Sequence, residues 1–486
     1  MPTTAIPHFD VIIVGAGLSG VGAAYHVQHD CPEMTFLVLE GRSSLGGTWD
    51  LFRYPGIRSD SDMYTLGFPF YPWKNPKAIA DGPAILKYIS DTVKAFQLDK
   101  YIRFNHKVTR ADWSSEVKKW TLGIEPNEHI SSPVIQCNFL FTCSGYYDYT
   151  HGYEPNFAGS EMFLGPIIHP QKWPADVSYS DKKVIVIGSG ATAVTLVPEL
   201  ARRAAEVVML QRSPTYIVSL PSEDVVADFL RKVLPGAWAH SLIRWKNIMF
   251  SQLFYQASRA WPGSIKKVIQ RRIRQELGDD FDMKHFDPEY KPWDQRLCIV
   301  PDSDLFHAIN SGKARVVTDT ISRFTPKGIL LESGTELEAD LIVTATGLNM
   351  QLLGGMELYK DGQAISASDT HCYKGVMFSG IPNFAMAIGY TNASWTLKCD
   401  LSCTFVTRVL RYMREHQYQT CVPRFDVNSF GSEPLLDFEA GYVKRALDIL
   451  PRQGSKAPWK VYQNYLRDLW LLKKNSLEDP SLVFEK

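Results

Sequence analysis

Short apolar runs that end at glycine-rich turns recur along this chain. The run at residues 10–14 is followed directly by Gly15-Ala16-Gly17-Leu18-Ser19-Gly20. A stretch with the apolar pattern of a helix (21–28) comes next, and a second apolar run (35–39) ends at Glu40. Brief buried runs bounded by turns are typical of strands in parallel sheets. The order strand, glycine turn, helix, strand and acid predicts a Rossmann-type dinucleotide-binding fold.

Each position of this first turn has an expected role. Gly15 permits the tight turn, Gly17 lets the backbone approach a pyrophosphate, and Gly20 allows the helix to pack closely on the strand. Ser19 lies within the turn, where free N–H groups at the helix start favour phosphate. Glu40, twenty residues after Gly20, is placed to accept hydrogen bonds from a ribose diol. The alternative, a glycine turn with no ligand, leaves the register of these elements unexplained.

The same pattern returns near residue 184. A strand at 184–187 leads into Gly188-Ser189-Gly190-Ala191-Thr192-Ala193, with Ala193 in the slot of the third glycine. The next strand, 207–210, ends in Gln211-Arg212-Ser213 instead of an acid. An acid would repel a 2′-phosphate, whereas Arg212 offers a planar fork of donors and Ser213 a hydroxyl. This site is therefore predicted to bind NADP(H); the alternative is a surface arginine without a ligand.

Two such folds in one chain predict two different dinucleotides, and the first, acid-ended one suits FAD. Segments 139–145 and 340–347 are each an apolar run ending in small residues and a glycine, as expected for the returning strand of each unit. The predicted architecture is α/β, with two Rossmann-like domains and a helical insertion. The expected boundaries are 1–148 and 349–486 for the FAD domain, 149–214 and 293–348 for the NADP domain, and 215–292 for the insertion.

The composition narrows the class of protein. The 486 residues are 45% apolar and 21% charged, and the formal net charge is zero, so no basic excess indicates nucleic acid. The first ten residues lack the pattern of a secretory signal, and no run of about 18 apolar residues indicates a spanning helix. The eight cysteines include no Cys-x-x-Cys, and Cys399 and Cys403 have the spacing of stacked neighbours on a helix. A cytoplasmic, reduced protein is expected.

The stretch from 224 to 286 is rich in aromatic and basic residues and has a helical pattern. One interpretation is a helical insertion that packs over the NADP domain and the pocket. The other is a basic, aromatic surface that touches a membrane interface, which would suit a lipophilic substrate.

Between the two glycine turns, residues 163–174 fit the pattern F-x-G-x-x-x-H-x-x-x-W-P at every defined position. In this the chain resembles the type I Baeyer–Villiger monooxygenases. Gly46-Gly47-Thr48-Trp49, residues 53–60 and residues 292–297 are similar to further segments of that family, and the last bears its catalytic arginine. Residues 61–64 and 389–395 look like the subgroup that contains the ethionamide-activating monooxygenase of mycobacteria.

The resemblance implies a reaction. NADPH would reduce FAD, O2 would be captured as a C4a-peroxyflavin, and a small lipophilic ketone would be converted to an ester or lactone, with sulfoxidation as a side activity. Arg296 would stabilise the developing anions, and Asp60 would orient Arg296. The expected contacts to FAD further include Thr48, Trp49, Asp50, Leu51, Arg58, Ser59, Asp60 and Val108.

Three other residues receive expected roles. Trp459 would pack either on retained NADP+ or in the core. His169 and Trp173 would belong to a linker that couples NADPH binding to domain motion. No second ligand stands at metal spacing from His169, so no metal site is expected.

The sequence departs from the family pattern in two places. Gln295 replaces a lysine that normally assists at the NADPH phosphate, which leaves more of the selectivity to Arg212 and Ser213. Asp50-Leu51-Phe52 replaces the usual Tyr-Trp-Asn, which bears on substrate range.

Competing hypotheses stay open. An N- or S-oxygenase of the same fold would usually carry another aromatic at Trp173. A pyridine-nucleotide:disulfide reductase would need a redox cysteine pair. A non-catalytic flavin-binding protein would leave Arg296 and Asp60 without a role.

Overall fold

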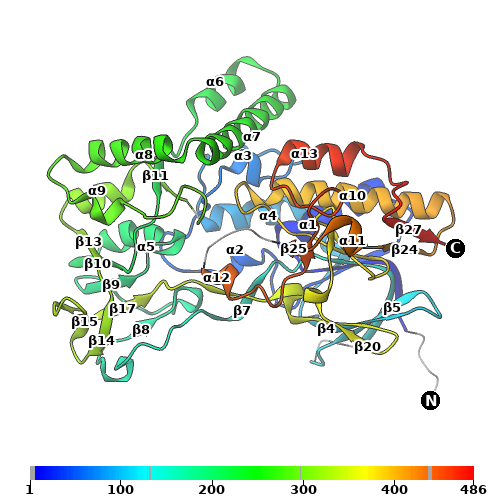
Figure 1. Ribbon diagram of the computed structural model, residues 1–486, viewed down its shortest axis with the longest axis horizontal. Coiled ribbons are helices and arrows are strands. Elements are labelled where there is room, and N and C mark those ends of the chain that lie inside the picture. Colours follow the sequence, from blue (N-terminus) through cyan, green and yellow to red (C-terminus); the bar gives the residue numbers. More distant parts are fainter. Residues whose placement is uncertain (1–5, 129, 131–132, 296, 436–440) are drawn as a thin grey trace.

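The computed structural model describes residues 6–128, 130, 133–295, 297–435 and 441–486. Two β-sheets with helices packed against them form an α/β fold, and they lie at opposite sides of Figure 1. Arg296 and residues 436–440 fall outside the described residues. No helix among the described residues is long and apolar enough to span a bilayer.

The larger sheet is built around the first glycine turn. Its strands are, in order, β20 (Gln363–Ile365), β19 (Glu357–Lys360), β4 (Val108–Ser114), β5 (Lys119–Ile124), β6 (Val134–Thr142), β1 (His8–Val14), β2 (Phe36–Leu39) and β3 (Ile102–Arg103), with β23 (Phe384–Met386) beside β6. Strands β23, β6, β1, β2 and β3 are mutually parallel. Strands β19, β20 and β23, all after residue 350, thus return to the sheet that opens the chain.

Both faces of this sheet are buried, which explains the unbroken apolar run in β1. Val11 and Ile13 face α1 (Leu18–Asp30), α4 (Gly82–Ala95) and α10 (Trp395–Glu415). Ile12 and Val14 pack instead with the tryptophan-bearing hairpin β4–β5. A parallel strand covered on both faces has no reason to alternate apolar with polar residues.

The smaller sheet repeats this plan around the second glycine turn. Its parallel strands are, in order, β13 (Ala314–Thr318), β10 (Glu206–Gln211), β9 (Lys183–Ile187), β17 (Leu341–Thr344) and β8 (Ile167–Ile168). One face packs on α5 (Ala191–Ala201) and α9 (Asp304–Asn310), and the other on the antiparallel strands β14 (Ile321–Thr325), β15 (Gly328–Leu331) and β16 (Glu336–Glu338).

The predicted returning strands are confirmed. Strand β6 pairs parallel with β1, and β17 pairs parallel with β9. A Cβ at Gly15 would lie 2.7 Å from the carbonyl oxygen of Cys143, and one at Gly188 would lie 2.4 Å from that of Ala345. Both glycines also have positive φ, +104° and +133°. Each turn therefore needs glycine because the end of its returning strand passes against it.

Two connections between the sheets pair with each other. Strand β7 (Tyr147–Gly152) runs antiparallel to β18 (Leu348–Met350). The ring of His169 packs on Gly152, and its Nε2 donates to the carbonyl oxygen of Gly347 at 3.0 Å, while its Nδ1 accepts from the Gln171 N–H. Burial lowers the pKa of His169, which favours the neutral ring. His169 thus follows strand β8 and contacts both connections; its linker and coupling roles stay predictions.

Three consecutive helices follow strand β10 of the smaller sheet in the chain, where the sequence pattern predicted helices. They are α6 (Val225–Val233), α7 (Gly236–Ala260) and α8 (Pro262–Leu277), which lie along the top of Figure 1. Helix α7 packs on α3 (Met63–Leu66), and Arg244 donates to the carbonyl oxygens of Tyr64 and Gly67 at 2.7 and 2.8 Å. The predicted insertion packs on both units. Helix α8 buries Ile269 and Ile273 in the core of the smaller sheet, as expected, whereas α7 buries Ile243 and Ile248 in the core of the larger sheet.

The remaining elements are short. They are α2 (Thr48–Leu51), η1 (Asp99–Tyr101), η2 (Ser160–Met162), η3 (Pro170–Lys172), β11 (Ile217–Leu220), η4 (Met283–Phe286), β12 (Cys298–Pro301), η5 (Leu352–Gly355), η6 (Ala367–Asp369), β21 (Cys372–Tyr373), β22 (Met377–Phe378), β24 (Thr420–Pro423), α11 (Val427–Phe430), β25 (Glu433–Pro434), α12 (Gly441–Lys444), β26 (Arg452–Gln453), α13 (Tyr465–Leu469), η7 (Trp470–Lys474) and β27 (Leu482–Glu485).

Candidate active site

A cavity of about 550 Å³ lies between the two sheets, and residues from both units line it. Its walls come from the first glycine turn, from α2 and the segment that follows it, and from the first turn of α5. The predicted site residues that line it are Gly15, Gly17, Ser19, Glu40, Thr48, Trp49, Leu51, Arg58, Ser59, Asp60, Val108, Ala191 and Thr192. The structure thus brings residues from both glycine turns to one cavity.

The other predicted residues lie outside the cavity wall, and most have a role that their position explains. Gly20 packs against the first turn, since a Cβ there would lie 1.8 Å from the carbonyl oxygen of Gly15. Ala193 is fully buried in α5 and packs in the smaller sheet's core. Both residues therefore let a helix approach its sheet.

Glu40 ends β2 in the wall of the cavity. One carboxylate oxygen accepts the Ala16 N–H at 2.7 Å and the other accepts the Arg42 N–H at 2.9 Å. Burial raises the pKa of Glu40, and these two hydrogen bonds oppose that rise. Each carboxylate oxygen has a second lone pair, so Glu40 can hold the turn and still accept from a ribose hydroxyl.

Asp50 is buried and links the segments on either side of α2. It accepts from Ser44 and forms ion pairs with Arg42 at 2.7 Å and Arg53 at 2.5 Å. Neighbouring Thr48 faces the cavity and is hydrogen-bonded to the hydroxyl of Tyr149 at 3.3 Å. Asp50 is thus committed to the protein, while Thr48 and Leu51 face the cavity.

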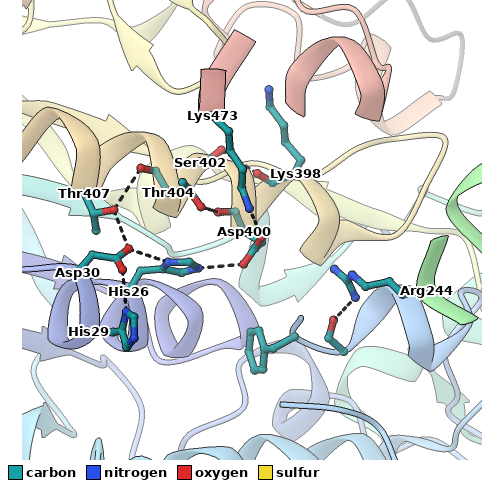
Figure 2. A network of polar contacts seen from close by, with 12 residues as sticks. His26, His29, Asp30, Arg244, Lys398, Asp400, Ser402, Thr404, Thr407 and Lys473 are labelled. Carbon is teal, nitrogen blue, oxygen red and sulfur yellow. Dashed lines mark hydrogen bonds and ion pairs between the residues drawn. The ribbon is translucent and has the colours of Figure 1, made fainter. Parts of the chain in front are cut away.

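Helix α10 fixes the start of α1. The Ser19 hydroxyl accepts from the Trp395 indole at 2.8 Å and donates to the Cys399 sulfur at 3.2 Å. Two turns further along α1, His26 lies between Asp30, at 3.2 Å, and Asp400 of α10, at 2.9 Å (Figure 2). These contacts hold the glycine turn in place against α10, which packs on the larger sheet.

Arg58 and Tyr54, in the segment after α2, contact helices that pack on the smaller sheet. The Arg58 guanidinium forms an ion pair with Asp304 at the start of α9. The Tyr54 hydroxyl is hydrogen-bonded to Thr192, and burial raises its pKa. Both contacts join the segment after α2 to helices of the smaller sheet, beside the cavity.

The second glycine turn lies open to solvent. A Cβ at Gly190 would meet nothing within 4 Å, and Gly190 precedes the first residue of α5. The Ser189 hydroxyl donates to the carbonyl oxygen of Ser213 at 3.1 Å and contacts the Thr215 hydroxyl at 2.7 Å. These bonds tie the turn to the segment after β10, which carries the exposed side chain of Arg212. A phosphate would therefore meet free N–H groups, a guanidinium and hydroxyls here.

Gln211, predicted to contact a cofactor, uses its side chain elsewhere. Its amide donates to the carbonyl oxygen of His285 at 2.7 Å and to the Thr318 hydroxyl at 2.8 Å, and it is 2% exposed. Successive side chains of a strand point to opposite faces, and the motif does not show which face each one takes. A cofactor contact by Gln211 would therefore use its backbone, and it stays a prediction.

The predicted catalytic pair is described only in part. Asp60 lines the cavity, but Arg296 falls outside the described residues. On either side of it, Asp294 pairs with Arg259 and Leu297 is buried. The contact predicted between Arg296 and Asp60 stays a prediction.

Trp459 packs in the core, which corrects the alternative that placed it on a cofactor. It is fully buried, its indole N–H donates to Ser481, and its ring contacts Tyr373 and Phe425. A tryptophan with this many ring neighbours contributes apolar burial to the core, and it does not line the cavity.

The sequence reasoning missed several residues of the cavity wall. Tyr146, Tyr147, Tyr149 and Tyr390 all line it. The first three follow Gly145, directly after the returning strand, and that position was the available signal. Among the described residues, all eight cysteines are free and buried, and no group of three or more candidate ligands could hold a metal ion.

Comparisons with known proteins agree with this geometry. Residues 10–411 match the flavin-binding monooxygenase-like family. The chain is 54% identical to the FAD-containing monooxygenase EthA of Mycobacterium tuberculosis, over 99% of this chain and 98% of that protein. It is 51% identical to EthA of Mycolicibacterium smegmatis, over 99% and 97%.

Solved structures share the fold. A steroid monooxygenase bound to NADP superposes with a TM-score of 0.79 at 21% identity, over 99% of this chain and 100% of that one. Cyclohexanone monooxygenase with bound ε-caprolactone gives a TM-score of 0.72 at 20% identity, over 86% and 90%. The resemblance drawn from residues 163–174 is thereby confirmed, and the chain belongs to the flavin-binding monooxygenase-like family as a flavoprotein monooxygenase.

Proposed function

We propose that this chain holds FAD at the first glycine turn and NADPH at the second, and uses O2 to convert ketones to esters or lactones, with sulfides as side substrates. The observation that carries this proposal is the single cavity lined by residues from both glycine turns. Two dinucleotides that exchange hydride must bring their rings together, and a shared cavity between their binding folds is where that can happen.

The residues at the first turn fit FAD. Gly15 and Gly17 leave the backbone open to the cavity, the N–H groups at the start of α1 suit a pyrophosphate, and Glu40 suits a ribose diol. Bound FAD would supply the redox chemistry that activates O2, which no side chain of this chain can supply.

The residues at the second turn fit NADPH. The open cradle at Gly190 and the exposed Arg212 suit a dinucleotide with a 2′-phosphate. The start of α5 contributes Ala191 and Thr192 to the cavity wall, so a dinucleotide held at this turn can extend toward the flavin site.

The remaining roles belong to this chain's own charged groups. Arg296 would stabilise the negative charge that develops on the ketone oxygen when an oxygen nucleophile adds to the carbonyl carbon. Asp60, in the cavity wall, would orient that guanidinium and offset its charge. The tyrosines that line the cavity would keep water from the reacting oxygen.

The decisive experiment follows the oxygen. The purified protein with FAD, NADPH and 18O2 is incubated with a panel of ketones and sulfides, and the products are analysed by mass spectrometry. We expect esters or lactones that carry one 18O atom. An S-oxide with no ester would favour the heteroatom oxygenase, and peroxide as the sole oxygen product would contradict both.

The role of Arg296 is tested in the same assay. Arg296→Ala is expected to remove ester formation while NADPH still reduces the flavin in the absence of O2. Arg323→Ala, an exposed arginine on β14, is the matched control and should behave as the wild type. Undiminished ester formation by Arg296→Ala would rule out the assigned role.

A further inference from the structure

Helices α6, α7 and α8 expose an unusual share of the chain's apolar surface. Of the 22 large apolar side chains that are exposed among the described residues, 12 lie between positions 225 and 268. They are Val225, Val226, Phe229, Val233, Trp238, Leu242, Trp245, Met249, Phe250, Leu253, Trp261 and Val268. Exposed apolar side chains gathered on three consecutive helices indicate an interaction site, whereas apolar residues scattered singly over a surface need no explanation.

The apolar residues of α7 form one stripe. Trp238, Leu242, Trp245, Met249 and Leu253 are spaced by three or four residues, so they lie on one face of a helix about 37 Å long. The opposite face carries the buried residues and packs inward. The helix is therefore packed on one side, and the stripe on its other side is exposed.

The stripe continues onto the C-terminal part of the chain. The Trp245 ring contacts the ring of Tyr465 on α13, with 6.0 Å between centroids. Next to Tyr465, Leu466 is 41% exposed, and Trp470 is 60% exposed. Figure 1 shows α6, α7 and α13 along the same upper side of the molecule. Two segments distant in sequence thus contribute to one apolar surface.

The charges on these helices are of one sign. Between residues 225 and 277 there are ten Lys and Arg but two Asp and Glu, in a chain whose net charge is zero. The two acids are half-buried, Asp228 pairing with Arg231 and Glu276 accepting from Ser303.

Six of the cations are exposed, at Lys232, Arg259, Lys267, Arg271, Arg272 and Arg274. Arg259 is paired with Asp294, and half-buried Lys266 is paired with Asp287. The exposed acids Glu223, Asp279 and Asp280 lie beyond the two ends of the segment. The exposed positions of these three helices therefore offer cations and no anion.

We propose that this surface docks the enzyme on an anionic lipid bilayer, with the α7 stripe at the interface and the α8 cations facing the headgroups. Tryptophans beside an apolar stripe with flanking Lys and Arg are the composition that favours the boundary between headgroups and acyl chains. A second copy of the chain would bring two cationic surfaces together, so charge complementarity favours lipid over self-association.

Vesicle sedimentation tests the proposal on the full-length protein with FAD bound. The wild type is expected to sediment with vesicles of phosphatidylcholine and phosphatidylglycerol (3:1), to bind neutral phosphatidylcholine vesicles more weakly, and to lose binding as salt is added. Absence of binding to the anionic vesicles at low salt would overturn the proposal.

Two variants separate the apolar and ionic contributions. The double variant Trp238→Glu/Leu242→Glu should abolish binding, and Lys267→Ala/Arg271→Ala/Arg272→Ala should lower the partition coefficient roughly 100-fold, since each cation near an anionic surface adds about fivefold. Val117→Glu, an equally exposed apolar position on a distant turn, is the control and should bind as the wild type. Equal binding by all four proteins would overturn the proposal.

Folding and self-association are read in the same preparations. Each variant should keep the wild-type circular dichroism spectrum and flavin content, because every replaced side chain is exposed. Gel filtration without lipid should give the same elution volume for each. A wild-type oligomer that Trp238→Glu/Leu242→Glu dissociates, without vesicle binding, would show that a second copy covers the surface and would overturn the proposal.

Discussion

Arg212 is the side chain that would distinguish NADPH from NADH in the proposed function. It is exposed, directly after β10, in a segment that Ser189 ties to the glycine turn. No acid follows this strand that could accept a hydrogen bond from a free 2′-hydroxyl. In the first unit, Glu40 stands at the corresponding position.

Arg212→Ala is expected to narrow the preference for NADPH over NADH by roughly 10- to 150-fold, the equivalent of one charged hydrogen bond of about 1.5–3 kcal/mol. The preference is measured as the ratio of kcat/KM values for the two cofactors. Arg202→Ala is the matched control, because it removes an exposed arginine at the far end of α5. An equal effect of both replacements, or a wild type with no preference, would contradict the assignment.

At the scale of elements, Gly17 and Gly20 of the first turn serve different purposes. Gly20 lets α1 approach the turn, since a Cβ there would lie 1.8 Å from a backbone oxygen. Gly17 begins α1 with ordinary negative φ, and a Cβ there would meet Gly47 at 3.6 Å, an ordinary contact, beside the cavity. One position thus serves the fold and the other serves the ligand.

Gly20→Ala is therefore expected to lower the free energy of unfolding of the flavin-free protein by about 1–3 kcal/mol or more. Gly17→Ala should leave that free energy within about 1 kcal/mol of the wild type and lower the flavin content of the purified protein. Urea unfolding and flavin absorbance measure the two quantities. A Gly17→Ala protein that retains full flavin content would argue against a pyrophosphate at this turn.

The contact between α1 and α10 makes the larger sheet sensitive to pH. Burial of His26 lowers its pKa, but the hydrogen bonds to the Asp30 and Asp400 carboxylates outweigh burial and raise the pKa to about 9 (Figure 2). The same pairing holds the pKa of Asp30 well below its usual range, although burial acts in the opposite direction. Lys473 adds a further cation 3.9 Å from Asp400.

Because the His26 pKa is raised on folding, its contribution to stability is complete below pH 6.5 and is lost as the pH rises through 9. The wild type should lose about 3 kcal/mol of unfolding free energy over this range through His26. His26→Gln should have a flatter profile, whereas His416→Gln, at the exposed end of α10, should keep the wild-type slope. Urea unfolding at several pH values measures the dependence of the unfolding free energy on pH. The same dependence in all three proteins would contradict this account.

At the scale of the whole molecule, the paired connections β7 and β18 join the two sheets. His169 rests on Gly152 of one connection and donates to Gly347 beside the other. Arg58 and Tyr54 join the segment after α2 to α9 and α5 at a second place. Movement of one sheet relative to the other must change these contacts.

Gly152→Ala would place a Cβ 2.0 Å from the His169 ring and displace it. We expect a stability loss of about 1–3 kcal/mol and less ester per NADPH consumed, with the balance appearing as peroxide. Gly123→Ala on β5 is the control, since its Cβ would make an ordinary contact of 3.6 Å. An unchanged ratio of ester to peroxide in Gly152→Ala would exclude a coupling role for this connection.

The local pattern determined the two glycine turns, the strands and helices beside them, and the acid and arginine that end the second strands. These features could be predicted because tight turns, helix starts and buried strands depend on neighbouring residues. The motif at 163–174 indicated the family for the same reason, since its residues are close in sequence. The strand positions of Glu40 and Arg212 followed from spacing alone.

Only the tertiary structure decided which of these residues share a cavity. Arg58 meets Asp304, Ser19 meets Trp395, and His26 meets Asp400, each across more than 200 residues of chain. It also decided that Gln211 and Trp459 face inward and that the α7 stripe faces outward. Which side of a helix or strand is covered depends on what packs against it, and no local pattern contains that information.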